Sequence, residues 1–271
     1  MNFRRLLKGA GQGEVIAPIL RAALWNPNFK SFSVKMPGFE ERPPDGWFHP
    51  STHPLWPERL LYYYLSDATR LTVEPFDPHT IMAFAQGHFW HEFIQHVGID
   101  NNVLRRPPGP CPCGCKSKKE WYVEDKETGS RGHMDGIVDP DTAAVDEPEV
   151  FEFKTMRPGR ASRLPKLPPG DPELVEFFRK MVPDYYAQGQ EYLRLSGYRR
   201  WRGLILSMEY PFDMREIVMG VDHAHNFEIE QKYRRVRQAV ADQTIPQPCC
   251  GPRTKEAKEC PARLICPVGL A

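Results

Sequence analysis

The chain has 271 residues, and its 36 basic and 35 acidic side chains give a formal net charge of +1. This balance excludes attraction of nucleic acid by the field of the whole molecule, so any contact with DNA must come from local patches. Seven cysteines, several at metal-like spacings, favour a reducing cytosol over a disulfide framework. Because residues 1–20 lack a sustained apolar core and no apolar run could cross a bilayer, we expect a cytoplasmic protein without a membrane partner.

Apolar periodicity, interrupted by 28 prolines, predicts the elements in chain order. A helix near 2–25 and a proline-rich arm to about 54 come before helices near 57–67 and 78–97. Strands near 120–125, 131–138 and 149–155 follow, then helices near 171–182 and 184–196, strands near 201–209 and 215–221, and a helix near 222–243. This order predicts an α/β fold whose central mixed β-sheet is flanked by helices.

Three parts are expected along the chain. Residues 1–56 would form an N-terminal helix and a proline-rich arm, and residues 57–244 the core, with a cysteine-rich insertion at 107–119. Residues 245–271 would form a cysteine-rich C-terminal tail packed on the core.

The helix near 78–97 carries the first candidate ligand. Asp77-Pro78 is a typical helix start and Gly98 is expected to end the helix. Gly87 costs about 1 kcal/mol relative to alanine, which suggests a close backbone approach. His91 is the best metal-ligand candidate, although a histidine on an apolar helix is more often a core residue. One side of the helix is mostly apolar, which predicts that the helix is largely buried. The residues of this apolar side are Ile81, Met82, Ala85, Phe89, Phe93 and Val97.

Carboxylates in two predicted strands give the strongest chemical signal. Glu152 and Lys154 are two residues apart, so they emerge on the same side of their strand. Asp135 can meet them if its strand lies alongside. Two acids that hold a hard divalent cation, with a lysine beside the attacking water, are what metal-dependent phosphodiester cleavage requires. The alternative is a turn acid and an ordinary Glu–Lys surface pair.

Two further features lie downstream. Gln188 and Tyr192 are four residues apart and share a helix face, although the polar edge of an amphipathic helix would explain them equally. The loop from 157 to 170 has no acidic residue and carries candidate phosphate-binding side chains, which solvated surface charge would also explain. These side chains are Arg157, Arg160, Arg163 and Lys166.

The order of these motifs resembles the RecB-like branch of the PD-(D/E)xK nuclease superfamily, including CRISPR-associated RecB-type exonucleases and their phage relatives. The matching motifs are Gly87…His91, Gly132…Asp135, Glu152-Phe153-Lys154 and Gln188…Tyr192, which span roughly the middle half of the chain. The resemblance implies a restriction-endonuclease-like core in a bacterial or phage protein. It also implies that His91, Asp135, Glu152 and the Phe153 carbonyl ligate Mg²⁺ or Mn²⁺. Lys154 would serve the nucleophilic water, and Gln188 and Tyr192 would line the site.

The cysteine-rich tail departs from this family. Similar proteins often hold an iron–sulfur cluster with one cysteine before the histidine helix and three near the C-terminus, but Trp56 stands at the first of these positions. The spacing from Cys260 to Cys266 matches the family, whereas the gap from Cys250 to Cys260 is longer. For this tail, an iron–sulfur cluster is the first expectation, zinc the second and the absence of a metal the third. The four ligands of a cluster or zinc ion would be Cys249, Cys250, Cys260 and Cys266.

A second cysteine group lies between the histidine helix and the Asp135 strand. Cys111, Cys113 and Cys115 suggest a zinc knuckle with a fourth ligand from elsewhere in the chain, although zinc usually prefers wider spacing. An exposed loop with reduced thiols is the alternative.

The leading hypothesis is a divalent-metal-dependent DNA nuclease, an exonuclease acting on single-stranded ends in recombination, repair or replication, with a helicase or recombinase as a possible partner. The alternative is a nucleic-acid-binding protein that is stabilised by zinc or an iron–sulfur cluster and has no nuclease activity. A zinc metalloprotease is excluded, because the second histidine of a His-Glu-x-x-His helix is replaced by Gln95, and His96 points elsewhere.

Overall fold

The computed structural model describes residues 13–24, 45–72, 76–115, 117–143, 145–208 and 213–268. The first part of the predicted N-terminal helix and most of the proline-rich arm lie outside these residues. The remainder of that helix forms α2 (Ile16–Leu24). Among the described helices, none combines the length and apolarity that a bilayer crossing requires.

The predicted elements are present and mostly agree within one or two residues. The helices are α3 (Glu58–Ser66), α4 (Pro78–Asp100), α7 (Pro172–Met181), α8 (Pro183–Ser196) and α9 (His223–Ala241). The strands are β1 (Trp121–Asp125), β2 (Ser130–Met134), β3 (Gly136–Val138), β4 (Glu149–Met156), β5 (Arg200–Ser207) and β6 (Met214–Gly220). Four short helices were not predicted: η2 (Ala68–Arg70), α5 (Pro140–Ala143), α6 (Pro158–Ala161) and α10 (Lys255–Glu259).

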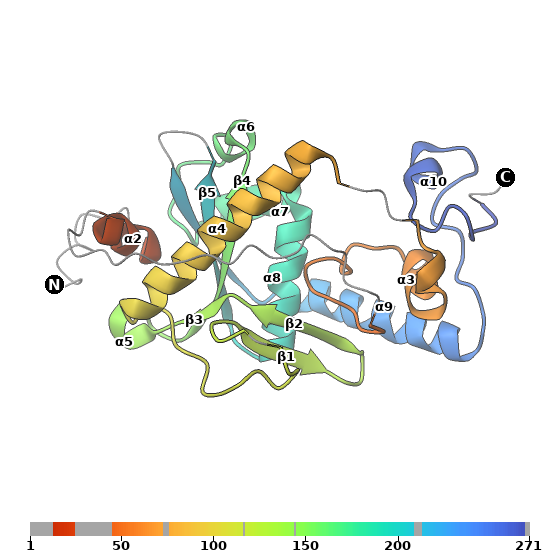
Figure 1. Ribbon diagram of the computed structural model, residues 1–271, viewed down its shortest axis with the longest axis horizontal. Helices are drawn as coiled ribbons and strands as arrows, with labels where there is room; N and C mark the ends of the chain where they lie inside the picture. The colour runs from red at the N-terminus through yellow and green to blue at the C-terminus, as the bar shows by residue number, and fades with distance from the viewer. Residues whose placement is uncertain are drawn as a thin grey trace.

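The core is a four-stranded mixed sheet in the order β3-β4-β5-β6, in which only the β4–β5 pair is parallel. Helices α2 and α4 pack on the face that carries Phe151 and Leu204, and α7 and α8 pack on the face that carries Val150 and Ile205 (Figure 1). This alternation follows from the two-residue period of a strand. The arrangement confirms the α/β fold with a mixed sheet flanked by helices and is consistent with a restriction-endonuclease-like core.

A smaller apolar cluster lies beside this core. It joins α3 and α9 to the C-terminal tail through Leu61, Tyr233, Ala262 and Cys266, at the right-hand end of Figure 1. Trp56 packs edge-on against His53 at a ring-centroid distance of 4.8 Å, so its side chain is part of an aromatic contact.

Three expectations for the site region were wrong. The strand predicted at 131–138 is split at Asp135: β2 pairs with β1 in a separate two-stranded sheet, whereas β3 joins the core sheet. Helix α4 is also less buried than predicted, because Met82 and Phe89 are 63% and 42% exposed and only its second half packs in the core. Gly98 does not end α4. A side chain there would lie 2.7 Å from Leu104, so glycine allows the following loop to pack against the helix.

Candidate active site

Asp135 lies at the break between the two sheets. Its Oδ2 accepts a hydrogen bond from the backbone N–H of Phe153 at 2.7 Å, and its carbonyl accepts one from Gln95 Nε2 at 2.8 Å. Since Gly136 pairs with Phe151 in the β3–β4 ladder, the start of β3 brings Asp135 beside Glu152. The strand break therefore gives one buried carboxylate a fixed position at the edge of β4.

Helix α4 brings His91 to this carboxylate. A Cβ at Gly87 would lie 3.3 Å from Thr155 Oγ1 of β4, so a glycine lets the helix approach the strand closely, as the sequence suggested. One turn later, His91 Nε2 lies 2.6 Å from Asp135 Oδ1.

Glu152 and Lys154 extend from β4 toward α8. Glu152 Oε1 accepts hydrogen bonds from Lys154 Nζ at 2.8 Å and Gln188 Nε2 at 2.9 Å. Glu152 Oε2 is buried and, among the described residues, has no hydrogen-bond partner. Lys154 Nζ also lies 5.4 Å from the ring centroid of Tyr185. Three of the predicted site residues are therefore in direct contact, and one buried carboxylate oxygen retains its acceptor capacity.

Glu120 was not identified from the sequence. One of its carboxylate oxygens lies within 4.8 Å of ligand atoms of both His91 and Asp135. It directly precedes β1, and the neighbouring Lys119 donates to Glu92 of α4 at 2.6 Å. The only signal in the sequence was an acid at the start of a strand, which is too common to single out.

The pKa values reflect an excess of negative charge. Burial lowers the pKa of His91, but Asp135, with Glu152 and Glu120, outweighs this and raises it from 6.5 to about 9. Burial and the Asp135 charge raise the pKa of Glu152 from 4.5 to about 7, although Lys154 opposes the change. Burial and Asp135 also raise the pKa of Glu120. Burial would raise the pKa of Asp135, but His91 and Lys154 outweigh this and lower it. Glu152 and Glu120 therefore hold their protons more tightly than free carboxyl groups, whereas Asp135 holds its proton less tightly.

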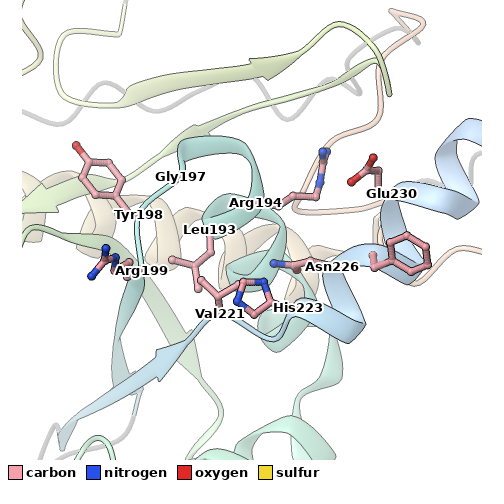
Figure 2. Close-up of a pocket in the computed structure, with 10 residues that line it drawn as sticks. Leu193, Arg194, Gly197, Tyr198, Arg199, Val221, His223, Asn226 and Glu230 are labelled. Atoms are coloured by element: carbon pink, nitrogen blue, oxygen red, sulfur yellow. The ribbon is translucent and has the colours of Figure 1, made fainter.

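Tyr192 is buried beside the site, and its hydroxyl donates to the His133 carbonyl at 2.7 Å. Glu120, His133 and Tyr192 line a hollow of about 140 Å³ together with His49, Pro50 and Ser51. A larger cavity of about 630 Å³ lies between the end of α8 and the start of α9, and no candidate site residue lines it (Figure 2).

The basic loop follows β4, as expected. Buried Ala161 and Leu164 anchor it, and Arg160 donates to the Met181 carbonyl at 2.8 Å. The other predicted DNA-binding side chains, Arg157, Arg163 and Lys166, are exposed and make no ion pair with a described residue.

The two cysteine groups differ in their surroundings. Cys111, Cys113 and Cys115 gather around His133, a residue that the sequence did not indicate as a ligand. The four tail cysteines line one small cavity beside α3, together with Arg59 and Tyr63. These cysteines are Cys249, Cys250, Cys260 and Cys266.

No protein-family model and no curated protein matches the chain. Among solved structures, SSO0001 is 16% identical with a TM-score of 0.38, over 96% of this chain and 100% of that chain. LHK-Exo in complex with dAMP is 12% identical with a TM-score of 0.41, over 73% and 89%. Another structure of this alkaline exonuclease from Laribacter hongkongensis is 13% identical with a TM-score of 0.38, over the same 73% and 89%. Similarities this low assign no activity to this chain, so its chemistry must be inferred from the residues of the site.

Proposed function

We propose that the protein is a divalent-metal-dependent DNA nuclease of the RecB-like PD-(D/E)xK type. The observation that carries this proposal is the buried Glu152 carboxylate, one oxygen of which has no hydrogen-bond partner among the described residues, coupled electrostatically to Asp135 and His91. A buried carboxylate oxygen without a donor is costly unless a cation compensates it.

The donor set fits Mg²⁺ or Mn²⁺. Carboxylate oxygens are the ligands that these hard ions prefer, and one imidazole nitrogen is compatible with Mn²⁺. The proposed ligands are His91, Asp135, Glu152 and the Phe153 carbonyl, and the position of Glu120 adds it as a further ligand. When bound, the ion would supply a Lewis acid that activates water and offsets the charge of the phosphate.

The chain's own residues would organise the reaction. Lys154 bonds to Glu152, so its ammonium is held where it can stabilise the attacking water and the developing negative charge. Gln188 bonds to the same carboxylate oxygen and would fix the Glu152 rotamer. Tyr192 supports the backbone of the strand before Asp135 through the His133 carbonyl.

The substrate would be DNA, held in part by the exposed basic side chains of the loop after β4. Arg157, Arg163 and Lys166 are available for phosphate contacts because none is engaged in an ion pair with the described part of the chain. We further propose action on single-stranded ends, in recombination, repair or replication and with a helicase or recombinase partner, on the basis of the motif resemblance.

The tail cysteines would hold an iron–sulfur cluster or, failing that, zinc. Arg59 lines their cavity, and its Nε and Nη1 are buried without a hydrogen-bond partner among the described residues. A metal centre with four thiolates is anionic and would compensate this guanidinium. An optical spectrum of anaerobically purified protein tests the assignment, because a broad absorption near the violet–blue boundary indicates iron–sulfur and a colourless zinc-loaded sample indicates zinc.

Digestion of end-labelled single-stranded DNA with Mg²⁺ or Mn²⁺ tests the nuclease. We expect Asp135→Ala and Lys154→Ala to abolish cleavage, whereas the exposed matched controls Asp141→Ala and Lys126→Ala retain it. Unchanged cleavage by both site variants would rule out this active site. A circular single-stranded substrate separates the two modes of attack, since an exonuclease leaves it intact.

The second candidate is a metal-stabilised nucleic-acid-binding protein without nuclease activity, favoured by the group of Cys111, Cys113, Cys115 and His133. It predicts salt-sensitive DNA retention with no metal-stimulated cleavage by the wild-type chain.

A further inference from the structure

We propose that Cys111, Cys113, Cys115 and His133 form a tetrahedral zinc site that fastens the cysteine-rich loop to β2. Zinc binding itself does not depend on the proposed nuclease, and only its effect on cleavage rests on that function.

The four donor atoms are already gathered. His133 Nε2 lies 3.2, 3.4 and 3.5 Å from the sulfurs of Cys111, Cys113 and Cys115, and the sulfurs of Cys111 and Cys113 are 3.0 Å apart. A tetrahedral Zn²⁺ with bonds of about 2.3 Å to sulfur and about 2.0 Å to nitrogen holds its ligands roughly 3.5–3.8 Å apart. The nitrogen–sulfur distances approach this spacing and the two sulfurs lie somewhat closer, so a small outward movement of the side chains would admit the ion. Cys₃His is an ordinary structural zinc set.

The turn of the loop explains how alternate cysteines can share one ion. Gly114 adopts a left-handed backbone conformation with φ of +80°, and its N–H bonds to the Cys111 carbonyl at 3.0 Å. This turn folds the segment back on itself, which relieves the crowding that the close spacing suggests. A side chain at Gly114 would meet no atom, so the glycine is explained by its conformation rather than by space.

The compactness of the group favours a single ion. All four donor atoms lie within 4.8 Å of one another, which leaves no room for the several iron and sulfide atoms of a cluster between them. Thiolates with one imidazole suit zinc rather than the hard cation expected at the acidic site. The chain would therefore bind two chemically different metals a short distance apart.

The zinc site would support one wall of the active site. His133 is two residues before Asp135 on the strand that breaks there, and its carbonyl is held by Tyr192. On the other side of the loop, Lys119 bonds to Glu92, the residue after His91. The segment between Cys115 and β1 carries Glu120, so loss of zinc would release this acid and loosen the backbone before Asp135.

Two measurements on the full chain test the proposal. Zinc content is determined for wild type, Cys113→Ser and His133→Asn, with Asp135→Asn as the control. Wild-type protein is also alkylated with and without a strong chelator and digested with trypsin, because the loop and tail cysteines fall on separate peptides. The second measurement needs no variant, so it remains informative if Cys113→Ser does not fold.

We expect both loop variants to lose one equivalent of zinc and Asp135→Asn to keep it, although Asp135→Asn would be inactive as a nuclease. Chelator should increase the alkylation of the loop peptide at least several-fold. Equal alkylation with and without chelator, or unchanged zinc in Cys113→Ser, would overturn the zinc site. Zinc retained by an inactive wild-type chain would contradict only the nuclease.

Discussion

Two buried charge clusters lie on β4, and they differ in how completely their acids are compensated. At Glu149, Arg202 donates to the carboxylate and also to Glu216 Oε2 at 2.6 Å, while Arg200 lies 4.0 Å from the remaining Glu149 oxygen. Glu216 Oε1 additionally accepts the backbone N–H groups of Ile16 at 2.7 Å and Ala17 at 2.8 Å, at the start of α2. Arginines and a helix N-terminus thus neutralise this cluster.

The cluster three residues further along β4 is different. Among the described residues, Asp135, Glu152 and Glu120 face two cationic groups, His91 and Lys154, and burial together with the Asp135 charge raises the pKa of Glu152. Both clusters contain buried acids beside basic side chains, so composition does not distinguish them. The balance of charge does, because two arginines, Arg200 and Arg202, face the two acids of the first cluster, whereas three acids share two cationic groups in the second. This balance indicates a structural role for the first cluster and a cation-binding role for the second.

The sharpest contrast should come from the same substitution at the two glutamates of β4. Glu152→Gln should lower the metal-dependent cleavage rate by about 100-fold or more, because a ligand charge is lost. It should leave the free energy of unfolding without metal unchanged or higher, since a poorly compensated buried charge is removed. Single-turnover cleavage and urea unfolding measure both quantities. Glu149→Gln is the matched control and should give the opposite result, lower stability with cleavage retained.

Arg202→Met tests the structural cluster directly. Removing the guanidinium leaves Glu149 and Glu216 buried without their main partner, which should cost about 3–5 kcal/mol in the free energy of unfolding. The control Arg200→Met removes a half-exposed arginine and should cost less than about 1 kcal/mol. Similar losses for the two variants would refute the distinction between them.

The pH dependence of stability should follow the acidic site. The folded-state pKa values of Glu152 and His91 are raised, to about 7 and about 9, so their protonated forms stabilise the fold. This contribution is present at low pH and is lost between about 4.5 and 7 for Glu152 and between about 6.5 and 9 for His91. The melting temperature without metal should therefore fall across this range, and the increase on adding Mn²⁺ should grow with pH. If the increase in melting temperature on adding Mn²⁺ became smaller as pH rises, the proposed ligands would be contradicted.

The smallest effect is expected from the basic loop. In an Asp135→Asn background, Arg163→Ala should weaken binding of single-stranded DNA and reduce the slope of log affinity against log salt by about 0.7 per lost phosphate contact. Arg234, which is paired with Glu127 and Glu230, is the control, and its replacement by alanine should change neither quantity. If the Asp135→Asn protein and its Arg163→Ala and Arg234→Ala derivatives had equal salt slopes, Arg163 would not contact the DNA backbone.

Local patterns in the sequence were sufficient for most of the fold. Apolar periodicity and the prolines that begin α4, α7 and α8 located these helices within a few residues, because caps and breaks act over one turn. The proximity of Asp135 to Glu152 could be predicted because it requires only that their two strands lie side by side. The short helices α5 and α10 have too few residues for a periodic signal.

The remaining features depend on contacts between distant segments. The strand break at Asp135 arises because β2 and β3 pair with different partners, which a continuous apolar pattern does not reveal. Glu120 and His133 join their sites only once the loop between α4 and β1 has folded back. The apolar first half of α4 gave no sign of its exposure, since the same residues would suit a buried helix.

The attachment of α2 to Glu216 has a consequence for synthesis of the chain. The N–H of Ile16 and its carboxylate acceptor are 200 residues apart, so the helix cannot be capped until β6 has left the ribosome. Until then the apolar side chains of Ile16, Ile19 and Leu20 lack the part of their surroundings that β5 and β6 supply. The nascent chain would therefore leave this apolar segment partly exposed until β6 has been synthesised, and the contact with Glu216 should be among the last to form.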